Sequence, residues 1–277
     1  AGAPSQRGVV DEALVEWLRS QPEQIEMEVA GKKLLMVHAT PWTRDYVFPG
    51  SREMRRFAEV EADFVLGGHT HAQVARRLRA GGVLGDLAPK RILAIGESQS
   101  AFMLTTYADG VQPLAQQYDG FFIHSRGRSG APLGEAGSGI NLVSSIAGSP
   151  MRIRADLSVP VLVLESETDM LFTLDYFPSR QENTELFRSW EMAGTAHADM
   201  YLLGDISALF ECGAPINAGP QHFIAKAALH HLQAWVAGGA PPAEAPLLSI
   251  ETGGSAPAYA RDADGIVLGG IRTPLVD

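Results

Sequence analysis

The feature that most constrains the fold is a short apolar run that breaks at a glycine and continues into a helical pattern, within residues 91–101. Four apolar residues precede Gly96, and such a run favours a buried strand. Gly96 and Ser100 lie two positions to either side of Ser98, and a sharp turn from strand to helix requires small residues there. Glycine is usual in both places, so Ser100 is a small departure. The pattern predicts a strand–turn–helix with the Ser98 hydroxyl at its apex, although an ordinary strand followed by a helix N-cap fits the same residues.

Beyond this turn the chain alternates apolar runs with helical patterns. Residues 120–124 and 159–164 are short and mostly apolar, and residues 187–192 mix Phe, Trp and Met with polar residues. Each of the three segments predicts a buried strand. Residues 99–107 and 219–236 place apolar side chains at helical spacing. This alternation predicts an α/β fold with a mainly parallel sheet and helices on both faces.

Three reactive side chains follow three of the predicted strands. Ser98 follows the first, Asp169 lies just past the strand at 159–164, and His197 lies just past the strand at 187–192. Because the carboxyl ends of parallel strands meet at one edge of a sheet, we expect the three side chains to lie close together. A serine hydroxyl near neutral pH needs a histidine to take its proton and a carboxylate to orient that histidine. The order therefore predicts a serine hydrolase with a Ser-His-Asp triad.

The neighbours of these residues complete the predicted site. The backbone N–H of Gln99, at the helix start, is expected to donate to the oxyanion. Glu165 and Glu167 lie on the same loop as Asp169 and are rival candidates for the acid. This chemistry requires no cofactor, and the expected partner is a small-molecule ester.

The first part of the chain has a different character. Residues 33–38 and 63–66 predict two more buried strands. His38 ends the first strand, and His69 and His71 follow the second across a Gly-Gly turn. Neutral imidazoles presented in this way suit a divalent metal such as Zn²⁺ or Mn²⁺. An equally good interpretation is a set of loop histidines that hydrogen-bond to water.

A glycine-rich stretch that ends in proline joins the two parts, at residues 80–89. Such composition is typical of a linker. We place the domain boundary near Leu84, so that the domains are residues 1–84 and 85–277. One arrangement that folds both parts together pairs strands 34–38 and 63–66 beside the strand at 91–95.

The second part resembles a family of bacterial alpha/beta-hydrolase-domain proteins. The matching segments are residues 96–101, 119–127, 167–169, 190–199, 215–222 and 269–274. The resemblance covers residues 85–277 and implies an α/β-hydrolase-like core with Ser98 as nucleophile, His197 as base and Asp169 as acid. The family pattern includes strands before the turn and continues past residue 274, so we expect this domain to be truncated at both ends.

The first part resembles the second half of a calcineurin-like metallophosphoesterase, through residues 37–41 and 62–71. In that family the three matching histidines, His38, His69 and His71, are ligands of a two-metal centre. The family's earlier Asp-x-His motif, bridging aspartate and Asn-His pair are missing here. We therefore expect a partial phosphoesterase-like α/β segment. A metal-dependent phosphoesterase remnant and a catalytically inactive hybrid are the alternatives to the serine hydrolase.

Composition excludes other classes of function. The chain has 277 residues, a formal net charge of -10 and only 19% charged residues, which disfavours nucleic-acid binding. No apolar run approaches the ~20 residues of a membrane span. The single cysteine, Cys212, excludes an internal disulfide. The N-terminal residues do not resemble a signal peptide, so we expect a cytoplasmic protein.

Overall fold

The computed structural model describes residues 24–29, 32–37, 64–67, 90–132, 142–204, 207, 216–218 and 221–272. The chain divides into two compact units, one of residues 1–88 with 203–214 and the other of residues 89–202 with 215–277. The domain boundary near Leu84 stays a prediction. In the described part of the chain, no helix is long and apolar enough to cross a membrane.

The first unit contains a small sheet of its own. Strand β1 (Gln24–Val29) pairs antiparallel with β2 (Lys32–Val37), which pairs parallel with β3 (Phe64–Gly67). The sequence predicts β2 and β3 to within a residue or two, but it does not predict β1. The arrangement in which β2 and β3 pair beside residues 91–95 is not found, because among the described strands β1, β2 and β3 form a separate sheet.

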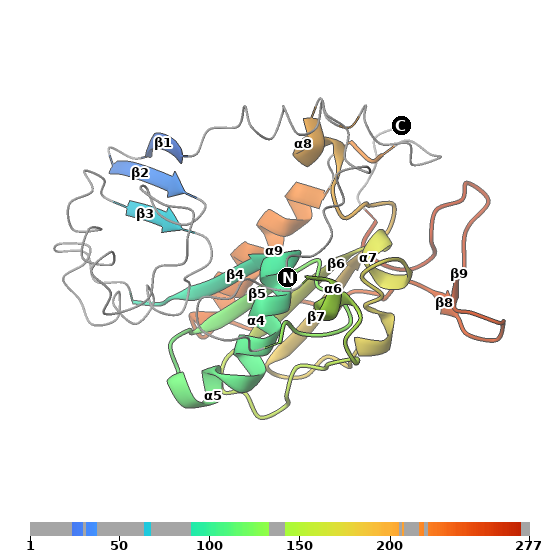
Figure 1. The fold of residues 1–277 in the computed structure, drawn as a ribbon, viewed down its shortest axis with the longest axis horizontal. Helices are drawn as coiled ribbons and strands as arrows, with labels where there is room; N and C mark the ends of the chain where they lie inside the picture. The colour runs from blue at the N-terminus through green and yellow to red at the C-terminus, as the bar shows by residue number, and fades with distance from the viewer. Residues whose placement is uncertain are drawn as a thin grey trace, which may run out of the picture. The chain divides into compact units, whose positions relative to one another are not determined.

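The second unit is built on a parallel sheet. Within the described residues its strands are β4 (Leu93–Glu97), β5 (Gly120–His124), β6 (Val161–Ser166) and β7 (Phe187–Met192), in that order (Figure 1). Each strand runs parallel to its neighbour. All four were predicted from the sequence, three of them from apolar runs and β7 from a segment that mixes apolar with polar residues. Every residue of β5, β6 and β7 is buried, as a sheet covered on both faces requires.

Helices α4 (Gln99–Gly110) and α9 (Gln221–Val236) cover opposite faces of this sheet (Figure 1). Successive strand residues point to opposite faces. Phe121 of β5 contacts Tyr107 of α4, with ring centroids 6.2 Å apart, whereas Phe122 belongs to the apolar core beneath α9. The α9 residues in that core are Ile224, Ala228, Leu232 and Trp235. These layers confirm the predicted α/β fold.

Shorter elements connect the layers. They are α5 (Gln112–Ala115), α6 (Leu142–Ile146), α7 (Glu167–Leu171), a 3₁₀ turn (Phe177–Ser179), α8 (Met200–Leu203) and the antiparallel pair β8 (Ile250–Glu251) and β9 (Ala258–Tyr259). Each spans five residues or fewer, which is too short to leave a clear periodic pattern.

The C-terminal segment lies against β7. Ile271 forms a parallel bridge with Met192, and its N–H donates to the carbonyl of Glu191 at 2.6 Å. The buried carboxylate of Glu191 accepts hydrogen bonds from the Arg180 guanidinium and, at 2.8 Å, from the Leu248 N–H. The β8–β9 hairpin is therefore anchored to the sheet by the residues on both sides of it.

Candidate active site

The turn after β4 holds Ser98 in an unusual backbone conformation. Its φ is 54° and its ψ is -117°, and α4 begins at the next residue. The Ser98 N–H donates to the carbonyl of His124 at the end of β5, at 3.0 Å. A Cβ at Gly96 would lie 2.8 Å from both the Leu104 side chain and the Ser100 carbonyl. The close approach explains the glycine, and the positive φ of Ser98 is the kind of local strain that proteins keep at functional sites.

Asp169 lies in the first turn of α7, directly after β6. Its Oδ2 accepts the Ser166 N–H at 2.7 Å, which closes a capping box at the helix start. The side chain is fully buried. Since the backbone bond fixes one carboxylate oxygen, the other is held in a defined direction.

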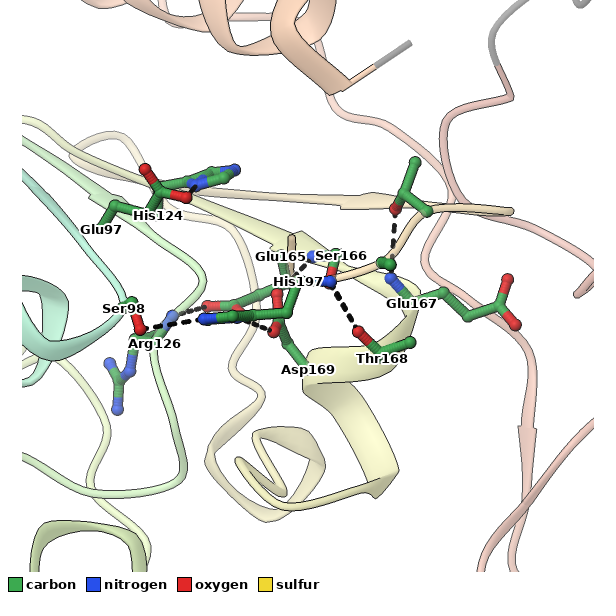
Figure 2. Close-up of polar contacts among 12 residues, drawn as sticks. Glu97, Ser98, His124, Arg126, Glu165, Ser166, Glu167, Thr168, Asp169 and His197 are labelled. Carbon is green, nitrogen blue, oxygen red and sulfur yellow. Dashed lines mark hydrogen bonds and ion pairs between the residues drawn. The ribbon is translucent and has the colours of Figure 1, made fainter. Parts of the chain in front are cut away.

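His197 lies on the loop that follows β7, and three hydrogen bonds fix it. Its backbone N–H donates to Thr168 Oγ1 at 2.7 Å. Its Nδ1 lies 2.7 Å from Asp169 Oδ1, and its Nε2 lies 2.9 Å from Ser98 Oγ. The fold thus brings Ser98, His197 and Asp169 into one chain of hydrogen bonds (Figure 2). The His197 side chain remains 34% exposed.

The surroundings of His197 set its charge preference. Burial alone lowers the pKa of the imidazole, but the hydrogen bond to Asp169 and the negative charges of Asp169 and Glu97 raise it. The net effect is a pKa above the ordinary histidine value. An imidazole in this setting accepts a proton readily when its Nε2 partner releases one.

Glu97 and His124 lie side by side next to Ser98 (Figure 2). The sequence gives no prediction for Glu97, and for His124, at the end of a predicted strand, it favours a structural role over lining the site. The Glu97 carboxylate lies 3.7 Å from His124 Nδ1 and is 48% exposed. Burial raises the pKa of Glu97, while His197 partly offsets that rise. Burial lowers the pKa of His124 to about 4, so this imidazole is neutral at pH 7. Their positions at the ends of β4 and β5 were the available signal.

The rival acids do not contact the imidazole. Glu165 is fully buried, and its Oε1 accepts the Arg126 N–H at 3.3 Å. Burial raises the pKa of Glu165 well above its ordinary value, which favours the neutral acid. The carboxylate of Glu167 binds the Gly194 N–H at 2.7 Å and Arg261 at 3.0 Å. Asp169 is the carboxylate that His197 contacts.

The remaining predicted groups have different outcomes. Gln99 is the first residue of α4, so its backbone N–H has no acceptor within the helix. Its oxyanion role stays a prediction. The proposed metal ligands His38, His69 and His71 lie outside the described residues. Among the residues that the structure describes, no group of three or more His, Cys, Asp or Glu side chains is placed to hold a metal.

Comparison with known proteins finds two family models that match parts of the chain. No curated protein and no solved structure matches it. A calcineurin-like phosphoesterase superfamily domain model matches residues 7–95. An alpha/beta hydrolase domain model matches residues 68–277, well over half of the 277 residues. The protein therefore belongs to the alpha/beta hydrolase domain family and is a hydrolase, and its N-terminal part is similar to a calcineurin-like phosphoesterase domain.

Proposed function

We propose that the protein hydrolyses carboxylic esters or related acyl substrates, with Ser98 as nucleophile, His197 as general base and Asp169 as the orienting acid. The observation that carries this proposal is the hydrogen-bond chain from Ser98 Oγ to His197 Nε2, at 2.9 Å, and from His197 Nδ1 to Asp169 Oδ1, at 2.7 Å. The strained backbone of Ser98 at a strand–helix turn supports the same role.

The reaction proceeds in two halves. Ser98 Oγ attacks the carbonyl carbon of the substrate while its proton passes to His197 Nε2. The tetrahedral intermediate then collapses, and the protonated imidazole gives that proton to the departing alcohol. Water attacks the acyl-serine with His197 again as base, which releases the carboxylic acid and restores the Ser98 hydroxyl.

Two groups lower the barrier around this chemistry. Asp169 keeps Nδ1 of His197 protonated, so that Nε2 is free to accept a proton, and it stabilises the imidazolium that forms. The Gln99 N–H donates to the oxyanion at the start of α4, and a donor of this kind contributes about 3 kcal/mol to stabilising the transition state.

The direct test is labelling by a fluorophosphonate probe, followed by peptide mass spectrometry. We expect the label on Ser98. We also expect Ser98→Ala to abolish both labelling and hydrolysis of p-nitrophenyl acetate. Ser100→Ala is the matched control, since it removes another hydroxyl from the same turn and should keep the activity. Equal hydrolysis by the wild type and Ser98→Ala, or a label on another serine, would refute the assignment. A protein that takes no label and hydrolyses no ester would instead be the inactive hybrid.

The family match over residues 7–95 favours a second candidate, a metal-dependent phosphoesterase activity. His38, His69 and His71 would be its ligands, because imidazole nitrogens bind Zn²⁺ and Mn²⁺ well. This candidate predicts bound metal by elemental analysis and hydrolysis of p-nitrophenyl phosphate that a chelator removes. It further predicts that Ser98→Ala leaves this hydrolysis unchanged and His69→Ala abolishes it.

A further inference from the structure

Glu167 joins three segments that are distant in the sequence. One carboxylate oxygen accepts the N–H of Gly194 at 2.7 Å, on the loop that leads to His197. The other oxygen pairs with Arg261 at 3.0 Å, in the C-terminal segment. The backbone carbonyl of Glu167 accepts the hydroxyl proton of Tyr259, at the end of β9. Both the charge and the backbone of Glu167 are therefore engaged outside its own helix.

The residues around Glu167 tie the Asp169 turn to the His197 loop. The Glu167 N–H donates to Thr195 Oγ1 at 3.3 Å, and the Thr168 N–H donates to the Thr195 carbonyl at 3.4 Å. Thr168 Oγ1 accepts the His197 N–H at 2.7 Å (Figure 2). Of these contacts, the Gly194 bond at 2.7 Å is short and accepted by a charged carboxylate, and charge assistance makes such bonds the stronger ones.

The position of Gly194 couples its hydrogen bond to the position of the His197 imidazole. Gly194 has a φ of 68° and lies three residues before His197. If the bond from its N–H to Glu167 is lost, this turn loses one of the hydrogen bonds that hold it to α7, and the His197 imidazole gains freedom to shift. A displacement of about 1 Å is enough to cost a positioned catalytic group up to 100-fold in rate.

We propose that Glu167 is a positioning residue that links the C-terminal hairpin to the His197 loop and thereby holds the imidazole in its hydrogen bond to Asp169. The rate effects that follow rest on the proposed function. The effect on the imidazole itself does not, because it concerns only the geometry of His197 and Asp169. Arg261 and Tyr259 act through Glu167, and none of the three contacts Ser98 among the interactions of the described residues.

The closing experiment measures rate, melting temperature and the His197 pKa in four variants. They are Glu167→Ala, Glu167→Gln, Arg261→Gln and, as the matched control, Arg272→Gln. Arg272 pairs with Asp262 at 2.9 Å in the same C-terminal segment and contacts no residue of the site. The His197 pKa is followed by NMR titration of its Cε1–H signal, which is assigned by its loss in His197→Gln.

For p-nitrophenyl acetate we expect kcat/KM to fall about 10- to 100-fold in Glu167→Ala. Glu167→Gln keeps an acceptor for Gly194 and loses the ion pair, so its loss should be smaller. Arg261→Gln should lower kcat/KM by a few fold, since Arg261 is 41% exposed and water screens its ion pair. Arg272→Gln should match the wild type.

The pKa of His197 separates positioning from simple electrostatics. The charged or titratable groups that face this imidazole are Asp169 from α7, Glu97 from β4 and His124 from β5. If Arg261 acts on His197 only through its positive charge, then Arg261→Gln should raise the His197 pKa. If Arg261 helps to position the imidazole, the same substitution should lower the His197 pKa, because the hydrogen bond to Asp169 becomes weaker.

Each result decides between the two claims. A lower His197 pKa in both Arg261→Gln and Glu167→Ala, with Arg272→Gln at the wild-type value, supports the positioning role. It does so even if the wild type proves inactive, in which case only the proposed function fails. A His197 pKa that is unchanged or raised in Arg261→Gln overturns the positioning role, and an active wild type then leaves the proposed function standing.

Discussion

Acid should destabilise this protein through one buried histidine. His124 ends β5, is 5% exposed and stacks on Phe122 with an interplanar angle of 27°. Burial lowers its pKa to about 4, against an ordinary value of 6.5. Between pH 4 and pH 6.5, His124 is mostly protonated in the unfolded chain and mostly neutral in the folded protein. The stability that this difference contributes is therefore present above pH 6.5 and is lost as the pH falls toward 4.

The size of the effect follows from the two pKa values of His124. They differ by about 2.5 units, and each unit corresponds to about 1.4 kcal/mol, so the full loss is about 3 kcal/mol. Most of this loss should already be present at pH 4.5. A loss of this size is a large part of the free energy of unfolding of a typical domain, which is roughly 5–15 kcal/mol.

Urea unfolding of the wild type and His124→Gln at pH 7.5, 6.5, 5.5 and 4.5 measures this term. The variant should be less stable at pH 7.5, because it loses the contact with Phe122. Its disadvantage should shrink by most of the ~3 kcal/mol by pH 4.5, because it lacks the titrating imidazole. His230→Gln removes an exposed histidine from α9 and is the control. Parallel curves of unfolding free energy against pH for the wild type and His124→Gln would refute the reasoning.

The other predictions concern the charges around Ser98. Asp169→Asn should lower kcat about 10⁴-fold, the cost of losing the orienting carboxylate of such a triad. The rate of p-nitrophenyl acetate hydrolysis should fall as the pH drops through the His197 pKa, which lies above the ordinary histidine value. Glu97→Gln should shift this fall in rate to lower pH, because the variant lacks a negative charge that raises the pKa of His197. A fall in rate at the same pH as in the wild type would show that Glu97 has no such influence. In the same variant, the ratio of kcat/KM for an ester that carries a free carboxylate to kcat/KM for its neutral methyl ester should rise, since Glu97 repels anions near Ser98. An unchanged ratio would count against that repulsion.

The sequence was sufficient to predict the second unit because its signals are local. Strands β5 and β7 begin and end at the residues predicted for them, and a reactive residue follows β4, β6 and β7 within a few positions. Ser98, Asp169 and His197 could be nominated together because parallel strands carry their carboxyl ends to one edge. The hydrogen bonds among them had to come from the structure.

The sequence could not predict the features of the site that depend on the direction of side chains. Glu165, Glu167 and Asp169 lie within five residues, and only the turn of α7 determines that Asp169 faces His197. Glu165 points into the buried interior, and Glu167 points to Gly194. The separate sheet of β1, β2 and β3 was missed for a related reason. Strand pairing is a choice among partners far apart in the chain. The sequence of β1 alternates exposed Glu26 and Glu28 with apolar residues, which is a strand signal of its own that a search for apolar runs does not find.

The order of the strands has a consequence for how this protein loses activity under stress. Among the described strands, β4 pairs with β5 alone, whereas β6 has a partner on each side. Ser98, the proposed nucleophile, follows β4, while His197 and Asp169 follow β7 and β6 and are joined through Thr168 and Glu167. Local opening of an outer strand requires less free energy than global unfolding. Mild heating should therefore abolish hydrolysis at a temperature at which most of the sheet is still folded. The activity that remains in a warmed sample would then be a smaller fraction than the fraction of molecules whose sheet is intact.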